Sequence, residues 1–459
     1  MRKIINEQPC FFINVFNAGK IVAEFREKYN KIDTLLDNNS EVLNIFHKDL
    51  SNFCSSEERE TNFSSEQILR MIIVKRIEEL PYRKCIIRVA ESDFLRNFTR
   101  IGMSKVMSYG LLCAAEKKIQ PSTWKQINSL LLNVALSQEK ISAEHMRLDS
   151  TVSETNIHFP TDNSLLWDSY RVISRIIGTL NKEEPLYNRD NRFHVKKIKK
   201  LYTFIATHSG RKNKSIKRKT KRFMKTLIER VENLCDRTRI YLDHAYTVFS
   251  SSVGHQGLLL ELERLLPLVR HVVSQAYRSQ VLGEKVPASE RIFSIFEEHT
   301  ELLKRGKSGS PVEFGHLVTL GQTKEKFISF YDVREKSLHD IEMKDKALES
   351  HKEEFGTYPK KFAADKNYWV NAEDIEKWEK DIELCAIAKK GRRNQAEYDR
   401  EHSDDFKCMQ RFRAGIEGTI SVLKRAFGLN ICRNRGFKSF ASSVGCLVFC
   451  HNLVLLAGM

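Results

Sequence analysis

The sequence lacks paired cysteines, a leader-like apolar segment and an uninterrupted apolar run of membrane-spanning length. Ten cysteines are scattered without a CxxC pair, so neither a disulfide framework nor a zinc ribbon is indicated, and a reducing compartment is expected. The first thirty residues mix charged and apolar side chains and lack a secretory h-region. Polar residues interrupt the apolar stretch from Phe440 to Ala457, which predicts a buried helix and not a bilayer span. We therefore expect a soluble, cytoplasmic protein.

Acidic residues are few relative to basic ones. The chain has 76 Lys or Arg against 59 Asp or Glu, a net charge of +17 at pH 7 and a pI near 9.3, which favours a polyanionic partner such as nucleic acid. Between Arg189 and Lys225, 15 basic residues accompany one acid, Asp190. A solvated face or a tether would have the same composition, but interleaved aromatic residues favour a structured helix. The candidate DNA contacts in this run are Lys217, Arg218, Lys219, Lys221 and Arg222.

The length of 459 residues and the hydrophobic content of 41 % predict two or three folded domains. The first, residues 1–140, reads as helical. Ser64 and Gln67 form a possible capping box at the start of one helix, Pro81 ends it, and further helices are expected at Tyr82–Ala90 and Ser104–Lys118. This periodicity fits a DNA-binding helix-turn-helix and a plain helical bundle equally well. The candidate phosphate contacts here include Arg83 and Arg88, with Lys84, Arg96 and Lys105 beside them.

The second part, residues 141–459, has the pattern of an α/β catalytic domain. A β-prone segment at Met146–Val152 is followed by a long helical and basic insertion at about 164–300, and a helix is expected at Leu338–Phe355. We expect one mixed sheet to unite the first segment with four later ones, which are Val312–Leu320, Phe327–Val333, Lys361–Ala364 and Leu384–Ala388.

Acidic residues stand where two of these strands end. Asp149 and Asp365 each follow apolar strand positions, and open α/β sheets carry their sites at the carboxyl edge. Glu417 is expected on the last helix packed against the same sheet. Carboxylates on three elements can hold two divalent cations about 3.5–4 Å apart. Hard oxygen ligands suit Mg²⁺, so the pattern predicts a metal site that breaks or joins phosphodiesters.

Two cations accompany Glu417 within the segment RFRAGIEGTISVLK. At about 100° per residue, Arg413 lies roughly 40° and Lys424 roughly 20° from Glu417 on a helical wheel. All three side chains can therefore reach one phosphate and its metal. A solvated helix with spaced ion pairs would show the same spacing. His316 is expected to be a core histidine, and Cys446 and Cys450 are expected to pack as apolar residues.

The sequence resembles the DDE transposases of bacterial insertion sequences, particularly the ISNCY-type group, over nearly its full length. The N-terminal blocks resemble the InsH-like domain of these proteins, and the last block is similar to their YREK-like signature, with Gln410 at the Tyr position. Asn367 follows the Asp-Lys pair where relatives often have Gly. The blocks that carry the resemblance are Ser64–Arg70, Tyr82-Arg83, Arg96–Phe98, Leu148–Asp168, Ser294–His316, Phe355–Tyr368 and Arg411–Arg425.

The resemblance implies an RNase H-like fold in which Asp149, Asp365 and Glu417 are the DDE ligands of two Mg²⁺ ions, with Mn²⁺ able to substitute. Arg413 and Lys424 would then bind the DNA phosphate near the cut. The implied activity is cut-and-paste DNA transposition at the terminal inverted repeats of a mobile element, by a homodimer or higher synaptic assembly in the bacterial cytoplasm, associated with the nucleoid and with no membrane partner. Two alternatives remain: a decayed copy that binds and represses, and a nuclease of the same fold without strand transfer.

Overall fold

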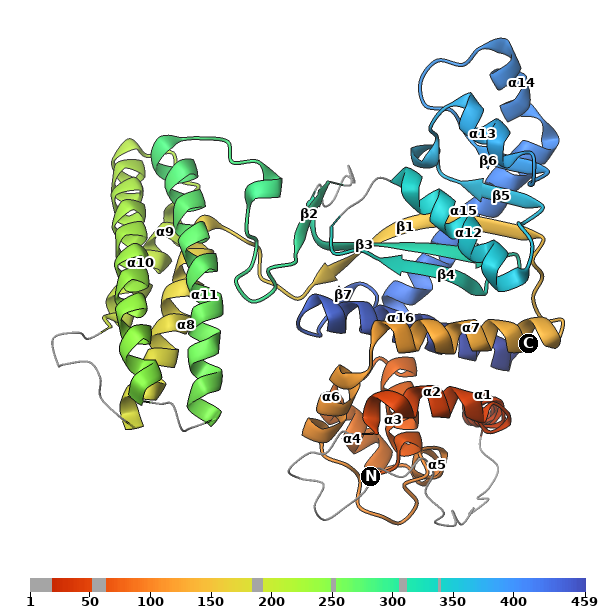
Figure 1. Cartoon of the computed structure of the whole chain (residues 1–459), viewed down its shortest axis with the longest axis horizontal. Coiled ribbons are helices and arrows are strands. Elements are labelled where there is room, and N and C mark those ends of the chain that lie inside the picture. The colour runs from red at the N-terminus through yellow and green to blue at the C-terminus, as the bar shows by residue number, and fades with distance from the viewer. Residues whose placement is uncertain (1–18, 52–62, 184–192, 249–252, 305–311, 337–339) are drawn as a thin grey trace. The chain divides into compact units, whose positions relative to one another are not determined.

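The computed structural model describes residues 19–51, 63–183, 193–248, 253–304, 312–336 and 340–459 (Figure 1). The chain divides into two compact units. The first combines residues up to 156 with residues 316–459, and the second comprises residues 157–315.

The first unit begins with seven helices that share one hydrophobic core with the C-terminal helix. The capping box is confirmed, because Ser64 Oγ accepts from the Gln67 N–H and the Gln67 side chain accepts from the Ser64 N–H. The helix at Tyr82–Ala90 is confirmed too, whereas the next predicted helix starts later than expected because Ser108 is its cap. The helices are α1 Lys20–Asn38, α2 Ser40–Leu50, α3 Ser65–Ile77, α4 Tyr82–Ala90, α5 Asp93–Phe98, α6 Tyr109–Lys118 and α7 Pro121–Ser137.

Seven strands form one mixed sheet, as predicted, in the order β2-β3-β1-β5-β6, with β4 paired to β3 and β7 paired to β1. Strands β5 and β6 run parallel to β1 and to each other, whereas β4 and β2 are antiparallel to β3 (Figure 1). The sequence pattern located five of these strands and missed the short β2 and β7. The strands are β1 His145–Thr155, β2 Glu301–Lys304, β3 Val312–Thr323, β4 Ile328–Val333, β5 Lys361–Ala364, β6 Leu384–Ile387 and β7 Ile431–Cys432.

Helices cover both faces of the central strands. On one face, Leu148, Phe362 and Ala364 pack against α12 (Asp340–Phe355) and α13 (Ala372–Trp378). On the other face, Ala363 and Ala386 pack against α15 (Asp404–Ala426), which follows the short α14 (Gln395–His402). The helix predicted at Leu338–Phe355, between the third and fourth predicted strands, is α12, which lies between β4 and β5 in the structure. The first residues of that prediction, 338–339, lie outside the described residues. This alternation decides which side chains face α15.

The C-terminal helix α16 (Phe437–Gly458) is the buried helix that the sequence predicts. It is long and apolar enough to cross a membrane, yet 89 % of its most apolar 18 residues are buried inside the protein. Its polar residues are satisfied internally: Ser442 accepts from the Trp124 indole, and Asn452 bonds both backbone groups of Ile328. His316 is fully buried against Phe437 and Phe440, as expected of a core histidine.

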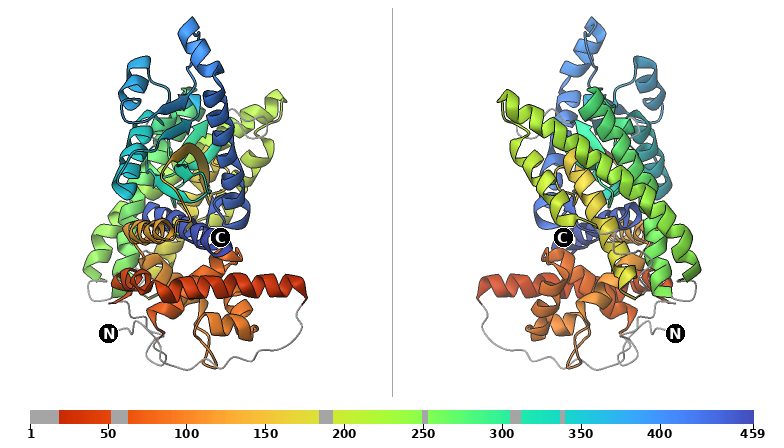
Figure 2. Two further views of the ribbon diagram at one scale, coloured as in Figure 1. Left: turned by 90° about the vertical axis from the view of Figure 1, so that its right-hand side faces the viewer. Right: turned by 90° about the vertical axis from the view of Figure 1, so that its left-hand side faces the viewer.

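The second unit is dominated by four helices that pack on one another through a single apolar core. Figure 2 shows these long helices lying side by side. The longest, α10, buries most of its Leu, Ile and Val residues, with Ile240 and Val248 as exposed exceptions, and turns its basic residues outward, which is the pattern of an amphipathic helix. The helices are α8 Asp162–Glu183, α9 Val195–His208, α10 Lys214–Val248 and α11 Val253–Tyr277, followed by single turns at Arg278–Leu282 and Ala288–Glu290.

Candidate active site

Asp149 and Asp365 lie where the pairing of the parallel strands β1 and β5 ends. Asp365 follows the last residue of β5, as predicted, but Asp149 lies inside β1, which continues to Thr155 and pairs there with β7. Leu148 of β1 pairs in register with Ala364 of β5, and the two acids are the next residues along each strand. Neighbouring strands lie about 4.8 Å apart, so the backbones of the two acids are separated by about that distance where the register continues. The sheet thus brings together two of the three acids predicted from the sequence.

Both acids are on the face of the sheet that α15 covers. Side chains alternate along a strand, and two residues before Asp149 the Arg147 side chain contacts Phe412 of α15. Two residues before Asp365, Ala363 packs in the cluster that contains Phe406 of α15. The extended backbone of Asp365 (φ −69°, ψ 156°) continues the alternation. The carboxylates therefore point toward the helix that carries Glu417.

Local hydrogen bonds hold the loop after β5 in place. Asp365 accepts from the Lys366 N–H at 2.8 Å and from the Asn367 side chain at 3.1 Å. The Tyr368 hydroxyl bonds Ser150 Oγ at 2.7 Å, one residue beyond Asp149. The Ser150 N–H in turn donates to Asp149 at 2.7 Å. Asn367 is thus a direct hydrogen-bond partner of one candidate metal ligand. The Tyr368 hydroxyl connects the segment that follows β5 to Ser150 of β1.

Helix α15 has clear sequence signals at both ends. Ser403 caps its first turn by accepting from the Phe406 N–H, and two acids follow in that turn, where the helix dipole favours negative charge. Lys424 and Arg425 occupy the last turn, where cations are favoured. The residues buried under the helix are Phe406, Met409, Ile416, Thr419 and Leu423.

The stripe of Arg413, Glu417 and Lys424 flanks this buried face. Glu417 is 66 % exposed and Arg413 is 20 % exposed, and their charged atoms lie 3.6 Å apart. Arg413 Nε is buried without a hydrogen-bond partner. The Gln410 side chain donates to the Ala386 carbonyl near the carboxyl end of β6 at 2.6 Å. Because Gln410 lies within about 60° of all three stripe residues on the helical wheel, this flank is directed toward the carboxyl edge of the sheet.

The third acid does not complete a metal-binding group in this structure. Across the parts of the chain that the structure describes, no three His, Cys, Asp or Glu side chains are gathered closely enough to hold a metal ion. Asp149 and Asp365 are neighbours across β1 and β5, whereas Glu417 lies on the exposed flank of α15.

A buried arginine beside the acids was missed in the sequence. Arg147 is 4 % exposed, and burial lowers the pKa of Arg147 to about 10. The available signal was a charged residue at an inward strand position two residues before Asp149, between the apolar residues Met146 and Leu148.

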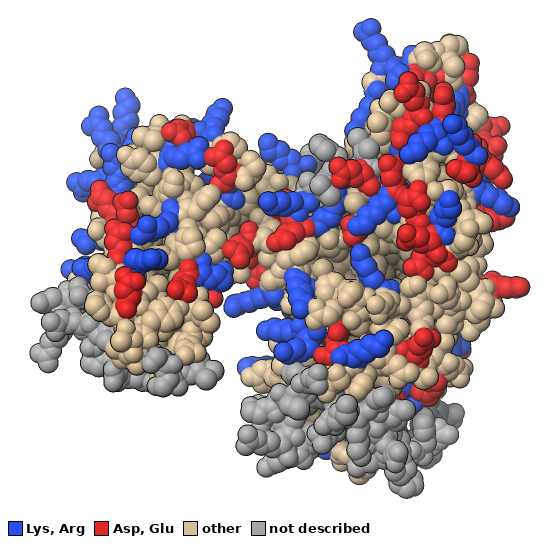
Figure 3. Space-filling view, viewed as in Figure 1, with Lys and Arg blue, Asp and Glu red and all other residues tan. Residues whose placement is uncertain are grey.

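The predicted DNA-contacting cations are exposed and belong to different elements. Five of them lie in the first turns of α10, which are Lys217, Arg218, Lys219, Lys221 and Arg222. Figure 3 shows Lys and Arg side chains at the upper end of this helical unit. Residues 189–192 of the basic run lie outside the described residues.

In the first unit, α4 exposes Arg83 and Arg88. Arg83 stacks on Tyr109 at 4.7 Å from the ring centroid, and Arg88 pairs with Glu78 at 3.0 Å. Lys84 and Lys105 are also exposed. Arg96 differs from these cations, because its guanidinium donates to the Gly102 and Ser104 carbonyls and so stabilises the loop after α5.

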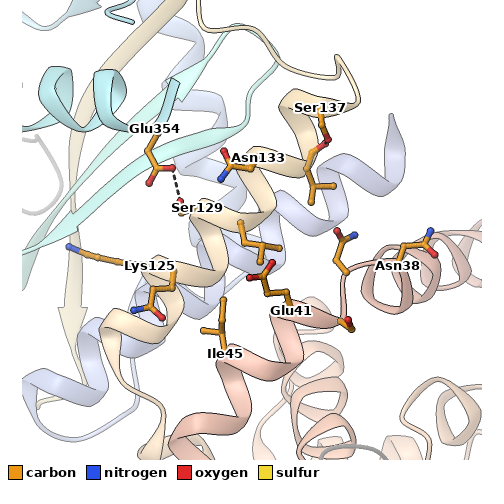
Figure 4. Close-up of a pocket in the computed structure, with 13 residues that line it drawn as sticks. Asn38, Glu41, Ile45, Lys125, Ser129, Asn133, Ser137 and Glu354 are labelled. Atoms are coloured by element: carbon orange, nitrogen blue, oxygen red, sulfur yellow. Dashed lines mark hydrogen bonds between the residues drawn. The ribbon is translucent and has the colours of Figure 1, made fainter. Parts of the chain in front are cut away.

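A groove of about 930 Å³ elsewhere in the first unit contains none of these candidate site residues (Figure 4). It runs along one side of α7, where Lys125, Ser129, Asn133 and Ser137 recur at every fourth position. The α1–α2 junction forms another wall, and Glu354 accepts a hydrogen bond from Ser129 at 2.6 Å. Amide and hydroxyl groups dominate its lining.

No protein-family model, curated protein or solved structure matches this chain.

Proposed function

We propose that this chain is a DDE-type transposase that binds the terminal inverted repeats of its insertion sequence and catalyses metal-dependent DNA cleavage and strand transfer. One observation carries the proposal: Asp149 of β1 and Asp365 after β5 follow residues that pair in register across the two parallel strands, on the face covered by the helix that carries Glu417, Arg413 and Lys424. An RNase H-like core is part of the proposal, and the mixed sheet with helices on both faces supports it.

The donor set fits divalent metal ions. Asp149, Asp365 and Glu417 would hold two Mg²⁺ ions, for which Mn²⁺ can substitute, because carboxylate oxygens are the hard ligands these ions prefer. When bound, the ions would lower the pKa of an attacking water and neutralise charge on the leaving oxygen.

The chain's own cations have a separate task. Arg413 and Lys424 stand on the same flank as Glu417 and would orient the scissile phosphate, since in-line phosphoryl transfer depends mainly on positioning and charge. Arg413 is suited to this because its guanidinium is only 20 % exposed and retains a buried N–H without a partner.

The remaining basic surfaces would hold DNA away from the cut. The exposed cations of α10 and of α4 lie on separate elements, which suits contact with a long duplex at more than one place. The expected partners are double-stranded DNA of the inverted repeats and of the target, and a second copy of this chain, because two ends must be joined. The proposed location is the bacterial cytoplasm, with the nucleoid.

The test is cleavage of a duplex carrying the inverted repeat, with Asp149→Asn, Asp365→Asn and Glu417→Gln compared with wild type. Each variant should lose about 100-fold or more in Mg²⁺-dependent cleavage, because it removes a metal ligand, and should keep its duplex affinity measured in Ca²⁺. Asp405→Asn is the matched control, since this acid lies on α15 and pairs with Lys361 at the amino end of β5.

The outcomes separate the candidate functions. If any of the three variants cleaves at the wild-type rate, the substituted residue is not part of the catalytic site. Duplex binding without Mg²⁺-dependent cleavage in the wild type would identify a DNA-binding repressor. Cleavage without joining of a pre-cleaved 3′ end to target DNA would identify a nuclease that lacks strand transfer.

A further inference from the structure

A buried arginine connects the first catalytic strand to the helix that carries Glu417. Arg147 of β1 donates from Nη1 to the Phe412 carbonyl of α15 at 2.7 Å, and its guanidinium lies over the Phe412 ring at 4.7 Å from the centroid. Its Nε donates to Gln322 of β3 at 2.8 Å. One side chain thus links two strands and the helix.

Gln322 carries the connection to a second point on the helix. Its amide nitrogen donates to Thr419 Oγ1 at 2.9 Å and to the Lys326 carbonyl at 2.7 Å. Phe412 and Thr419 are seven residues apart, about 10 Å along the helix axis, and Glu417 lies between them. Anchoring at two points fixes both the height of the helix and its rotation about its own axis.

The helix is shaped to receive the guanidinium. A Cβ atom at position 415 would lie 2.3 Å from Arg147 Nη1, so only glycine allows this approach. Glycine in a helix interior is less stable than alanine. Arg147 Nη2 is also buried without a hydrogen-bond partner, which adds a desolvation cost. An apolar residue would attach the helix to the strand without these costs.

We propose that Arg147 is a positioning residue, which fixes the height and rotation of α15, and thereby the position of Glu417, over the face of the sheet on which Asp149 and Asp365 lie. This inference rests on the proposed function, because it assigns the three acids to one metal site. It adds the residue that sets the position of Glu417 relative to the other two acids.

A metal site with ligands on separate elements requires that the helix carrying one ligand be held in a fixed position. A carboxylate about 5–6 Å from a helix axis moves by about 2 Å when the helix rotates by about 20°. Ligand distances in a metal site must hold to within about 0.2 Å, so a rotation of α15 of this size changes whether Glu417 can reach a metal ion held by the other two acids. An arginine suits this task because its planar group offers donors in a fixed arrangement.

The experiment measures Mn²⁺ binding to the full-length protein by the loss of the free Mn²⁺ signal in electron paramagnetic resonance. Arg147→Lys and Gly415→Ala should each weaken Mn²⁺ binding about 10- to 100-fold, the usual effect of losing support behind a metal ligand, with duplex affinity in Ca²⁺ unchanged. Arg147→Lys keeps the charge and loses the fork of donors. Gly415→Ala leaves Arg147 unchanged in sequence but moves its guanidinium, because the added methyl group occupies its place. The same substitution increases the helix propensity of position 415.

Arg400→Lys is the matched control. Arg400 also donates to a backbone carbonyl, that of Cys385, and lies over a phenylalanine of α15, Phe406, at 5.5 Å. Its partner on α15, Phe406, lies in the amino half of the helix, away from Glu417. This variant should therefore bind Mn²⁺ as wild type does.

Two further comparisons make each result decisive. Asp149→Asn should abolish tight Mn²⁺ binding; if it does not, or if wild type binds none, the metal site of the proposed function fails. If Asp149→Asn behaves as expected but Arg147→Lys and Gly415→Ala bind Mn²⁺ like wild type, the positioning role is overturned. Urea unfolding reports whether each variant is folded. Should either variant be unfolded, Thr419→Val, which removes only the far acceptor, decides by the same measurement.

Discussion

The basic start of α10 makes a quantitative prediction about DNA binding. Lys217 and Lys221 lie about 40° apart on the helical wheel, and Arg218 and Arg222 repeat that spacing about 100° further round. These four exposed cations occupy one side of the helix. Lys219 is directed elsewhere and lies over Phe204 and Phe223, at 4.9 and 5.6 Å from the ring centroids. One duplex can therefore contact the four cations together but not Lys219.

The magnitude follows from counterion release. Each phosphate contact contributes about −0.9 to the slope of log K against log salt, so changing all four residues to Gln should reduce the slope by about 3–4. Between 50 and 200 mM salt, the affinity of the wild type should consequently fall about 150-fold more than that of the variant. The loss should be similar for inverted-repeat and unrelated duplexes, because phosphate contacts carry no sequence information directly.

The assay is fluorescence anisotropy of a labelled duplex across a salt series. A control variant changes Lys20, Lys31, Lys377 and Lys380 to Gln, which removes the same net charge from exposed positions elsewhere, and its slope should stay within about 1 of the wild-type value. Lys219→Gln alone should also leave the slope unchanged. A slope that changes by less than about 1 in the fourfold α10 variant would mean that this surface does not contact DNA.

Two stability predictions follow from the core of the first unit. Glu116→Gln leaves Lys75 and Arg76, which contact Glu116 at 2.7 and 3.0 Å, buried without a counter-charge, and should cost about 3–5 kcal/mol in urea unfolding at pH 7. Burial opposes ionisation of Glu116, but the two cations outweigh burial and lower the pKa of Glu116 to about 2. The difference in unfolding free energy between wild type and variant should therefore be full above about pH 4.5 and shrink as the pH falls through 2. A difference below about 1 kcal/mol at pH 7 contradicts this. Gly445→Ala places a Cβ 2.5 Å from Trp124 Cβ and 2.7 Å from the Tyr331 hydroxyl and should destabilise by about 1–3 kcal/mol. Its control Gly178→Ala, with no atom within 4 Å of the added Cβ, should be neutral or stabilising, and equal thermal shifts for the two would refute the packing argument.

The sequence located the longer elements because their signals are local. Helix α4 begins after Pro81 and β5 ends at Ala364, as the pattern predicts, and the capping box at Ser64 formed as expected. The missed elements depend on tertiary partners. Strand β7 has two residues and exists only because it pairs with Glu154 and Thr155 of β1. Helix α5 has six residues, too few for a helical period to be visible.

The candidate site divides in the same way. The rule that sites occupy the carboxyl edge of a sheet selected Asp149 and Asp365, but the register that makes them neighbours is a tertiary fact. The wheel angles of α15 predicted the stripe that contains Glu417, yet not the height of the helix over the sheet. Arg147 escaped notice because an arginine at an inward strand position is recognisable only once its partners on α15 and β3 are known.

The charges around Asp149 and Asp365 bear on the proposed cation-binding role of these two acids. Asp149 and Asp365 follow residues that pair across parallel strands, and like charges on neighbouring strands repel each other. The Ser150 and Lys366 N–H groups donate to the two carboxylates, but a bound divalent cation would offset this repulsion more strongly than neutral donors do. In the proposed site, Arg413 would add a positive charge on the same flank of α15 as Glu417, whose carboxylate lies 3.6 Å from it, and this pairing of an acid with a cation suits a site that holds both a metal ion and a phosphate.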